Sequence, residues 1–304
     1  MPELPEVETV VRGLQGLVGK RIRKVEVRRP KLVSVGPGTL SPKRSHTAAQ
    51  ARRFSAVLQG RSVQSITRRA KLICIQLSGG WTLFIHLKMA GQLVVQKAKQ
   101  RKLLIRLLNT PTAPLEMLPT KHTHIICTFG DGTILYFNDI RLFGTWRVVH
   151  TRDHAALQDV ASYGPEPLEK DFTAKVLQAS LGKRPRMLIK QALTDQQLLA
   201  GVGNIYADES LFAAKLLPTR TVGSLQPKDW LRLFQSVQKV LRHAIRTHGS
   251  SVGEFIRPDG SMGMFGRYHK VYGRKGEPCV ICKTPIRKIV VGGRGTHYCS
   301  KCQE

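Results

Sequence analysis

The first residues of the chain carry groups that could do covalent chemistry. Pro2 follows Met1, and Glu3 and Glu6 come soon after it. Removal of Met1, which a small second residue normally permits, would leave Pro2 as a secondary amine. An α-amino group titrates near pH ~8, so a useful fraction is neutral and can attack an electrophilic carbon to form a Schiff base. Glu3 could then donate a proton to an opening sugar or leaving group, and Glu6 could orient both residues.

The same residues also fit a purely structural role. Proline is favoured in the first turn of a helix, and glutamates there interact well with the helix dipole. On Pro2, Glu3 and Glu6 alone the structural role is the simpler interpretation. The rest of the chain has to decide between the two.

The cysteines of the chain are of two kinds. Two of them stand alone in apolar, strand-like runs and are expected to be buried, inert thiols: Cys74 and Cys127. Four others form two C-x2-C pairs with sixteen residues between the pairs: Cys279, Cys282, Cys299 and Cys302. This spacing is typical of zinc ribbons and predicts one structural Zn²⁺ with four cysteine ligands. The alternative, two disulfides in a secreted module, fits poorly with an N-terminus that has no signal-peptide pattern.

The charge balance points to a polyanionic partner. The 304 residues include 49 Lys and Arg against 20 Asp and Glu, a formal net charge of +29. Nucleic acid is the expected partner, and an anionic membrane or a ribosomal surface are the alternatives. No run approaches the ~18 apolar residues of a membrane span. We therefore expect a cytoplasmic, nucleoid-associated monomer that does not bind membranes.

The first half of the chain has the pattern of a β-sandwich. Short apolar runs are joined by glycine-rich turns, without the spacing of βαβ units. The expected elements are hairpins over 72–77 with 81–87 and over 124–129 with 133–137, strands over 21–28 and 103–108, and a helix over 46–59. Segments 31–45 and 95–120 are expected to be surface loops.

Beyond residue 160 the pattern becomes helical. Residues 163–171 contain two prolines and are expected to be a linker, and residues 173–214 favour helix with an interruption at 200–206. Apolar residues at steps of three and four predict an amphipathic helix over 227–248, and 250–275 is expected to be a flexible loop. The expected fold class is α+β, with a β-sandwich domain over 1–160, a helical domain over 161–270 and a zinc ribbon over 271–304.

Motifs along the whole chain resemble the formamidopyrimidine-DNA glycosylase family. They are, in order, PELPEVETV, RRAK, HLKMAG, NDIRLFG, YGPEPL, DQQLLAGVGNIYADE, VYGRKGEPC and GGRGTHYC. The opening motif distinguishes this family from its endonuclease VIII-like branch. The resemblance implies a helix-two-turn-helix domain and double-stranded DNA with damaged bases as partner. It also implies release of 8-oxoguanine and formamidopyrimidines, followed by β- and δ-elimination.

The resemblance also assigns catalytic roles. Pro2 matches the nucleophile that attacks the sugar C1′, and Glu3 matches the proton donor. Lys71, in RRAK, matches the lysine associated with β-elimination and phosphate contact. Arg294 matches the arginine credited with δ-elimination and with binding phosphate beside the lesion.

A second set of residues matches DNA-contact positions. An enzyme that attacks the sugar of a stacked nucleotide has to flip it out, and the void is then filled by protein. Met89, Arg141 and Phe143 match the void-filling residues, although Met89 and Phe143 by themselves better suit ordinary core at strand ends. The remaining matches to phosphate-contact positions are Asn204, His122, His86, Tyr272, Arg186 and Lys190.

The chain departs from the family pattern in two motifs. In HLKMAG, Lys88 and Ala90 replace the glycine and serine of the usual HLGMSG. In DIRLFG, Ile140 and Leu142 replace the proline and the second arginine of the usual DPRRFG. Two alternative functions therefore stay open. One is the same chemistry on oxidised pyrimidines, set by a lesion-capping region within 250–270. The other is a zinc-ribbon DNA-binding protein without chemistry, against which an intact Pro2 and Glu3 argue.

Overall fold

The computed structural model describes residues 1–304 except 39–46, 101, 108–113, 157–159, 161 and 254. The chain divides into two compact units. The sandwich unit comprises Met1–Ala161 and the returning segment His248–Met264, and the helical unit comprises Ser162–Thr247 and Phe265–Glu304.

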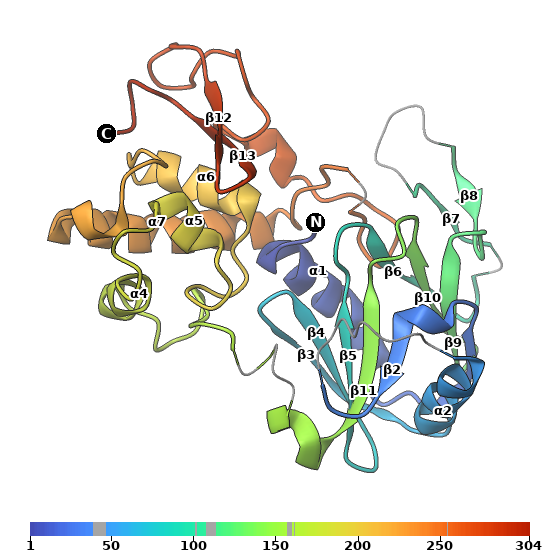
Figure 1. Ribbon diagram of the computed structural model, residues 1–304. Helices are drawn as coiled ribbons and strands as arrows, with labels where there is room; N and C mark the ends of the chain where they lie inside the picture. Colours follow the sequence, from blue (N-terminus) through green and yellow to red (C-terminus); the bar gives the residue numbers. More distant parts are fainter. Residues whose placement is uncertain (39–46, 101, 108–113, 157–159, 161, 254) are drawn as a thin grey trace. The chain divides into compact units, whose positions relative to one another are not determined.

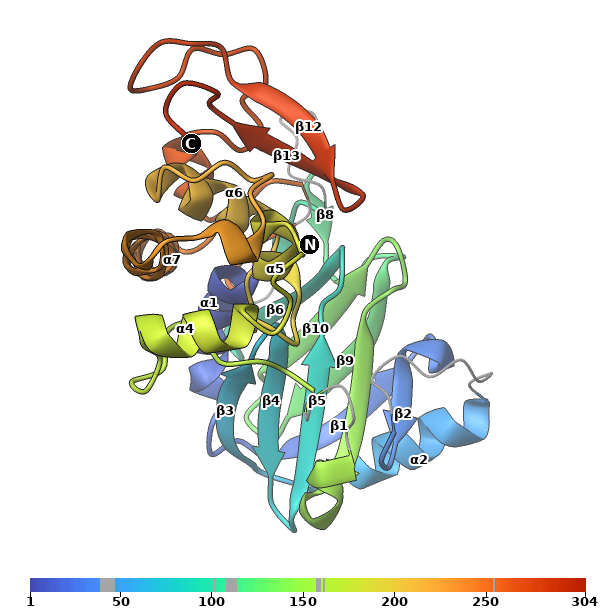
Figure 2. The ribbon, with the colours of Figure 1, turned by 60° about the vertical axis from the view of Figure 1, so that its left-hand side comes forward.

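Two sheets form the body of the sandwich unit, as the sequence predicts (Figures 1 and 2). One sheet has the strand order β1 (Ile22–Val27), β9 (Thr123–Phe129), β10 (Ile134–Asp139) and β6 (Gly91–Gln96). The other has the order β2 (Val33–Val35), β11 (Thr145–His150), β5 (Trp81–His86), β4 (Leu72–Leu77) and β3 (Val63–Arg69). All neighbouring strands are antiparallel except β2 and β11, which are parallel.

An apolar core lies between the sheets. It includes Phe137 of β10 and Trp146 of β11, whose rings meet edge to face with centroids 5.5 Å apart. Gly144 has to be a glycine here, because a Cβ at this position would lie 2.5 Å from the Phe137 ring. The packing of the core thus fixes the turn that enters β11.

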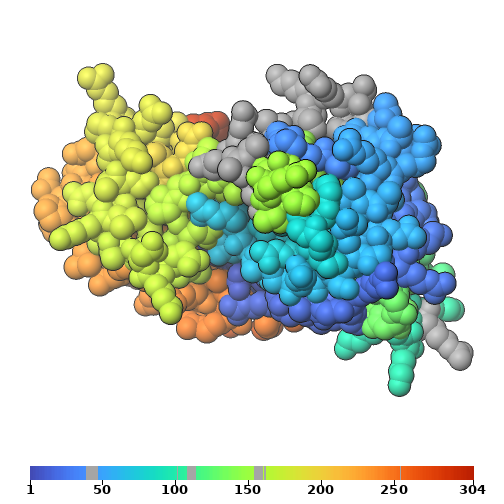
Figure 3. All heavy atoms as spheres, turned by 90° about the horizontal axis from the view of Figure 1, so that it is seen from below, coloured from blue at the N-terminus to red at the C-terminus, as the bar shows by residue number. Residues whose placement is uncertain are grey.

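Helices and short 3₁₀ turns complete the sandwich unit. They are α1 (Leu4–Leu14), η1 (Gln15–Leu17), η2 (Pro30–Leu32), α2 (Ala48–Leu58) and η3 (Thr151–Ala156). The η3 turn starts beside the β4–β5 turn, because Thr151 donates its backbone N–H to the Gly80 carbonyl at 2.7 Å. Figure 3 shows these two turns next to each other on one face of the molecule.

The hairpins that the sequence predicts are present as β4–β5 and β9–β10, but two loop predictions are wrong. Segment 31–45 contains β2, and 95–120 contains a small antiparallel pair, β7 (Leu104–Ile105) with β8 (Glu116–Met117). The strand expected over 103–108 is only β7. The start of the helix expected over 46–59 lies outside the described residues, and α2 begins after Thr47, whose side chain accepts the Gln50 N–H.

α1 runs along β3 with its N-terminal end toward the β3–β4 turn. Near the C-terminal end of the helix, Gln15 donates to the Ile66 carbonyl at 2.9 Å, and further back Glu8 pairs with Arg68 at 3.3 Å. Because α1 runs antiparallel to β3, its first residues approach the turn after β3, which carries Ala70 and Lys71.

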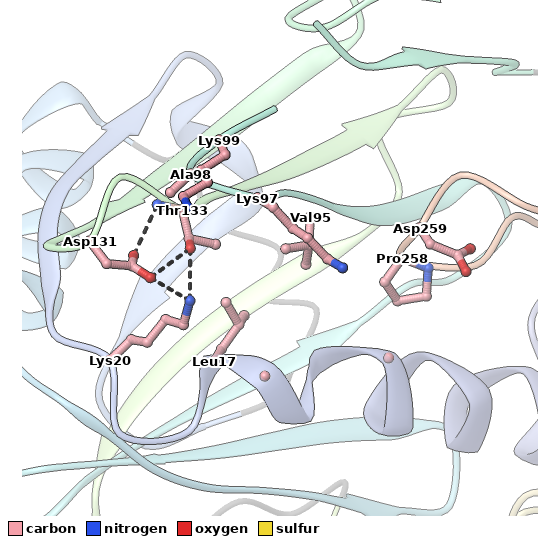
Figure 4. Close-up of a pocket in the computed structure, with 12 residues that line it drawn as sticks. Leu17, Lys20, Val95, Lys97, Ala98, Lys99, Asp131, Thr133, Pro258 and Asp259 are labelled. Atoms are coloured by element: carbon pink, nitrogen blue, oxygen red, sulfur yellow. Dashed lines mark hydrogen bonds and ion pairs between the residues drawn. The ribbon is translucent and has the colours of Figure 1, made fainter. Parts of the chain in front are cut away.

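The other end of α1 packs against the returning segment His248–Met264. The Pro258 carbonyl accepts the backbone N–H of Val95 at 2.8 Å, and the ring of Pro258 lies against Gly13. A pocket of about 440 Å³ opens beside this contact, between α1, the end of β6 and the β9–β10 turn (Figure 4). Its far wall is held by Lys20, which binds Asp131 and Thr133.

Substitution of Gly13 tests this contact. A Cβ at Gly13 would lie 2.7 Å from Pro258, whereas a Cβ at Gly16 would have no heavy atom within 4 Å. We expect Gly13→Ala to lower the free energy of unfolding by about 1–3 kcal/mol through overpacking. Gly16→Ala should be neutral or slightly stabilising. Urea denaturation of both variants measures the difference, and equal stabilities would contradict the contact.

The helical unit contains four helices, two 3₁₀ turns and one hairpin in its described residues. They are α4 (Ala174–Leu181), α5 (Ile189–Thr194), α6 (Asn204–Ala213), η4 (Val222–Ser224), α7 (Pro227–Arg246), η5 (Phe265–Tyr268), β12 (Arg287–Val291) and β13 (Arg294–Tyr298). The predicted amphipathic helix is α7, which begins at Pro227 as expected and buries one apolar face. The helix break expected over 200–206 reaches only to residue 203, because α6 begins at Asn204. No helix among the described residues is long and apolar enough to span a membrane.

Candidate active site and DNA-contact residues

The N-terminal residues lie buried at the start of α1. Pro2 is buried, and Glu3 is the residue that precedes the helix and is 3% exposed. Glu6 accepts the backbone N–H of Glu3 at 2.8 Å, as in a capping box. The helix-starting role of this segment and the chemical role expected for it are therefore compatible, because the cap holds Glu3 in place beside Pro2.

Glu6 also binds a segment far away in the sequence. Its second carboxylate oxygen accepts the backbone N–H of Ser250 at 2.7 Å. The preceding Gly249 has a φ of 78°, and a Cβ there would lie 2.9 Å from Glu6. One buried carboxylate thus ties the start of α1 to the returning segment.

We expect Glu6→Gln to loosen the N-terminus. A glutamine has only one oxygen, so its NH₂ group would face one of two N–H donors and leave that donor unpaired. The expected loss is about 1–3 kcal/mol in the free energy of unfolding, measured by urea denaturation.

The matched control is Glu8→Gln, two residues later in the same helix. Glu8 pairs with Arg12 and Arg68 and its side chain is 22% exposed. Such a pair contributes about 1 kcal/mol or less. Equal effects of the two substitutions on the free energy of unfolding would contradict the role of Glu6.

Two turns of the sandwich unit meet at one end of the sheets. One connects β5 to β6 and carries Met89; the other connects β10 to β11 and carries Arg141 and Phe143. Because β5 pairs with β11 and β6 with β10, with Asp139 opposite Gly91, the two turns lie side by side. The sequence motifs HLKMAG and NDIRLFG are thus brought together.

The three residues expected to fill a void in DNA are exposed at this end. Met89 is 37% and Phe143 is 52% exposed, and the Arg141 guanidinium lies 5.1 Å from the Phe143 ring centre. The alternative interpretation, that Met89 and Phe143 are ordinary core, is therefore wrong. Exposed apolar side chains on tight turns are what a wedge between bases requires.

Asp139 shapes the second turn, and sequence reasoning missed it. Its carboxylate accepts the backbone N–H groups of Arg141, Phe143 and Gly144 at 2.7–2.9 Å, and the side chain is buried. An aspartate two residues before Arg141 is the signal of such a side-chain-held turn.

Lys71 and His86 lie at the same end of the sandwich. Leu72, next to Lys71, pairs with His86 across β4 and β5, and Lys71 is buried. His86 Nδ1 lies 3.0 Å from the Lys88 backbone N–H and accepts from it. Burial, and then the ammonium groups of Lys88 and Lys71, lower the pKa of His86 to about 3. His86 is therefore neutral at physiological pH and serves as an acceptor for the turn.

The turns of this end have a strained backbone. Ala70, Lys88 and Leu142 have φ values of 52°, 52° and 57°, in the left-handed region that non-glycine residues rarely adopt. Each stands next to a predicted site residue. Such strain is typical of functional sites. His122 borders the same end, since its carbonyl accepts the Asp139 N–H at 3.0 Å.

In the helical unit, Asn204 and the hairpin lie together. Asn204 is the first residue of α6, and its amide donates to the Gly295 carbonyl at 2.8 Å. Gly292 and Gly293, both with positive φ, form the two-residue turn of the hairpin. Arg294 follows this turn and is exposed. An N-terminal helix end with an adjacent arginine is a suitable phosphate site.

The other residues of the helical unit that are expected to contact phosphates differ in exposure. Lys190 is fully buried, pairs with Asp208 and donates to the Asn204 carbonyl at 2.8 Å. Tyr272 is half-buried and donates its N–H to Glu209. Arg186 is exposed ahead of α5. The structure thus places Lys190 behind Asn204 rather than on the surface.

The four cysteines of the two C-x2-C pairs gather as the spacing predicts. Their sulfurs all lie within 4.8 Å of one another. The Sγ atoms of Cys282 and Cys299 are 3.4 Å apart and those of Cys279 and Cys302 are 3.9 Å apart, far beyond the ~2.05 Å of a disulfide. The cluster of Cys279, Cys282, Cys299 and Cys302 can therefore hold one tetrahedral Zn²⁺.

The electrostatics of this cluster favour a cation. Hydrogen bonding from Thr284 lowers the pKa of Cys282 to about 6, so one thiolate forms readily. Burial and then the neighbouring thiols raise the pKa of Cys302 to about 12, because its thiolate would be poorly hydrated and would lie among other sulfurs. A dication would remove that penalty.

Comparisons with known proteins cover almost the whole chain. Residues 1–146 match the model of the formamidopyrimidine-DNA glycosylase N-terminal domain, 163–255 that of its H2TH domain, and 276–304 a zinc finger found in FPG and IleRS. The formamidopyrimidine-DNA glycosylases of Bacillus subtilis and Brevibacillus brevis are each 40% identical, over the full chain and 99% of their own length.

Solved structures agree with these relatives. The MutM (Fpg) protein of Thermus thermophilus has a TM-score of 0.80 and 36% identity, covering 99% of this chain and 98% of that one. Lactococcus lactis Fpg, in complex with DNA that contains N7-benzyl-Fapy-dG, has a TM-score of 0.81 and 33% identity over both full chains. The chain belongs to the formamidopyrimidine-DNA glycosylase family.

Proposed function

We propose that the protein is a bifunctional DNA glycosylase and abasic-site lyase that removes 8-oxoguanine and formamidopyrimidines from double-stranded DNA. The observation that carries this proposal is the arrangement at one end of the sandwich unit. A buried Pro2 and Glu3, held by Glu6, begin the helix whose first residues approach the Lys71 turn. The exposed Met89, Arg141 and Phe143 stand on the paired turns of the same end.

The first chemical step belongs to Pro2 and Glu3. Met1 is 42% exposed and accessible to removal, which leaves the Pro2 nitrogen as a secondary amine. Its lone pair forms a bond to C1′ as the bond from C1′ to O4′ breaks, and O4′ takes a proton from Glu3. The nitrogen then loses its proton, and its lone pair expels the damaged base, which takes up that proton, to leave an iminium at C1′.

The following steps cleave the strand. The iminium acidifies C2′, whose proton is lost as the 3′ phosphate departs, and loss of the C4′ proton then expels the 5′ phosphate. In this proposal Lys71 assists the first elimination and Arg294 the second. Met89, Arg141 and Phe143 fill the void left by the flipped nucleotide.

The remaining predicted residues bind the DNA backbone. His86, His122, Asn204, Tyr272 and Arg186 contact phosphates or hold the groups that do, and Lys190 acts through Asn204. Zinc held by the four cysteines stabilises the hairpin that presents Arg294. With a net charge of +29, binding should weaken steeply with salt.

Oxidised pyrimidines are a second candidate substrate class. Lactococcus lactis Fpg, 33% identical, has been solved in complex with DNA that contains an oxidised pyrimidine. The cellular setting in this proposal is the bacterial cytoplasm, with the enzyme acting as a monomer on nucleoid DNA, as its bacterial relatives and its charge suggest.

The test uses the native protein with removal of Met1 verified by mass spectrometry. It is incubated with duplexes that contain 8-oxoguanine, a formamidopyrimidine, an oxidised pyrimidine or no lesion, with and without borohydride. We expect cleavage and a covalent adduct mapped to Pro2 on the purine lesions. Preference for pyrimidine lesions would favour the second candidate. If no lesion gives an adduct, the proposed chemistry fails and the protein is a zinc-ribbon DNA-binding protein without chemistry.

A further inference from the structure

Asp208 is a buried acidic residue of the helical unit. It lies on α6, is 1% exposed and pairs with the ammonium group of Lys190. Its other oxygen accepts the backbone N–H of His297 at 2.9 Å and lies 3.2 Å from the ring Nδ1 of the same histidine. One carboxylate therefore joins α5, α6 and β13.

This contact is the second of two between α6 and β13. Asn204 and Asp208 are four residues apart and face the same side of α6. Their partners Gly295 and His297 are two residues apart and face the same side of β13. Lys190 links these two contacts, because it binds Asp208 and donates to the Asn204 carbonyl.

Arg294 stands directly before the first of these contacts. Its backbone position relative to Asn204 is set by how β13 lies on α6, and Thr296 between the two contacts is fully buried. A shift of β13 along α6 would move the Arg294 guanidinium away from the phosphate that Asn204 helps to bind. Misplacement by about 1 Å costs up to ~100-fold in rate when the group acts on the reacting atoms.

We propose that Asp208 is a positioning residue that holds β13 on α6 so that Arg294 and Asn204 bind the DNA backbone in register, and that it thereby sets the efficiency of the second strand cleavage relative to the first. The proposal rests on the proposed function for the roles of Arg294 and Asn204. A purely structural role is the alternative, since a buried ion pair that loses one partner destabilises any protein.

Two variants separate these roles. Asp208→Asn keeps an oxygen for the His297 N–H but leaves Lys190 without its countercharge. Lys190→Met with Asp208→Leu removes both charges, which is often neutral for stability, but also removes the acceptor for β13. The control is Asp229→Asn, a buried aspartate of α7 in the same unit that pairs with Arg220 and Arg232.

The measurement is single-turnover cleavage of a duplex with an abasic site, using zinc-loaded full-length protein. Relative to Lys190→Met alone, which keeps the acceptor for β13, the double variant should slow the second cleavage about tenfold or more and the first by less than about threefold. Asp229→Asn should lower stability without changing this ratio. An unchanged ratio in both Asp208 variants would overturn the proposal.

A second readout does not depend on catalysis. Equilibrium binding to a duplex with an uncleavable abasic analogue should show a salt slope reduced by about 1 in the double variant, because one phosphate contact is lost. If the native protein cleaves nothing, the proposed function fails, but this slope still decides whether Asp208 positions the hairpin. An unchanged slope together with normal affinity counts against it.

Discussion

Glu3→Gln is expected to separate base release from strand cleavage. Glutamine keeps the shape of the buried side chain beside Pro2 but cannot donate a proton. Loss of a general acid costs about 10²–10⁴-fold, and we expect a loss in this range for release of 8-oxoguanine. On a pre-formed abasic site the sugar already opens to an aldehyde, so the Pro2 amine still forms a Schiff base.

The measurement combines single-turnover base release with borohydride trapping on an abasic duplex. Thermal denaturation of the variant is the control, because Glu3 also caps α1. Retained trapping with lost base release would support the proton-donor role. Equal losses on both substrates, with normal stability, would mean that Glu3 acts by positioning Pro2 instead.

Removal of zinc is expected to abolish tight DNA binding. The hairpin region has a small apolar cluster made of Phe212, Val271 and Ile286 with the cysteines, too little to fold without the metal. A structural zinc site contributes about 10–16 kcal/mol of apparent binding energy in small zinc modules. We expect chelation or Cys282→Ser to raise the Kd for a lesion duplex by at least about 100-fold, because the phosphate contacts proposed for Arg294 would be lost.

The matched control is Cys74→Ser, which changes a thiol on β4 outside the cluster. It should keep one zinc per chain and normal affinity. Zinc content is measured by metal analysis and affinity by fluorescence anisotropy. Unchanged binding by a chain that has demonstrably lost its zinc would refute the role of the cysteine cluster.

The parts of the fold that the sequence predicts correctly depend on local patterns. The β4–β5 and β9–β10 hairpins follow from alternating apolar runs around glycine turns, and α7 follows from its helical period and Pro227. The strand β2 escapes prediction because it is three residues long and gains its stability from pairing with the distant β11. Such non-local pairing leaves no local pattern.

For the site, too, the sequence predicts what local patterns carry and misses what depends on distant contacts. The cysteine spacing and the resemblance of the motifs locate the candidate residues, but not their surroundings. Asp139 escapes prediction because its role depends on three backbone N–H groups that converge only in the folded turn. The resemblance places Lys190 at a phosphate, whereas its burial behind Asn204 depends on Asp208 on another helix.

The bond from Ser250 to Glu6 has a consequence for the synthesis of the protein. The two residues are 244 positions apart, so the start of α1 cannot be fully organised until most of the chain has left the ribosome. At about 5–20 residues per second, this delay is about 12–50 s. In the proposed function, the amino terminus is thus open during translation to the peptidase that removes Met1, and the Pro2 amine is locked into place only in a nearly finished chain.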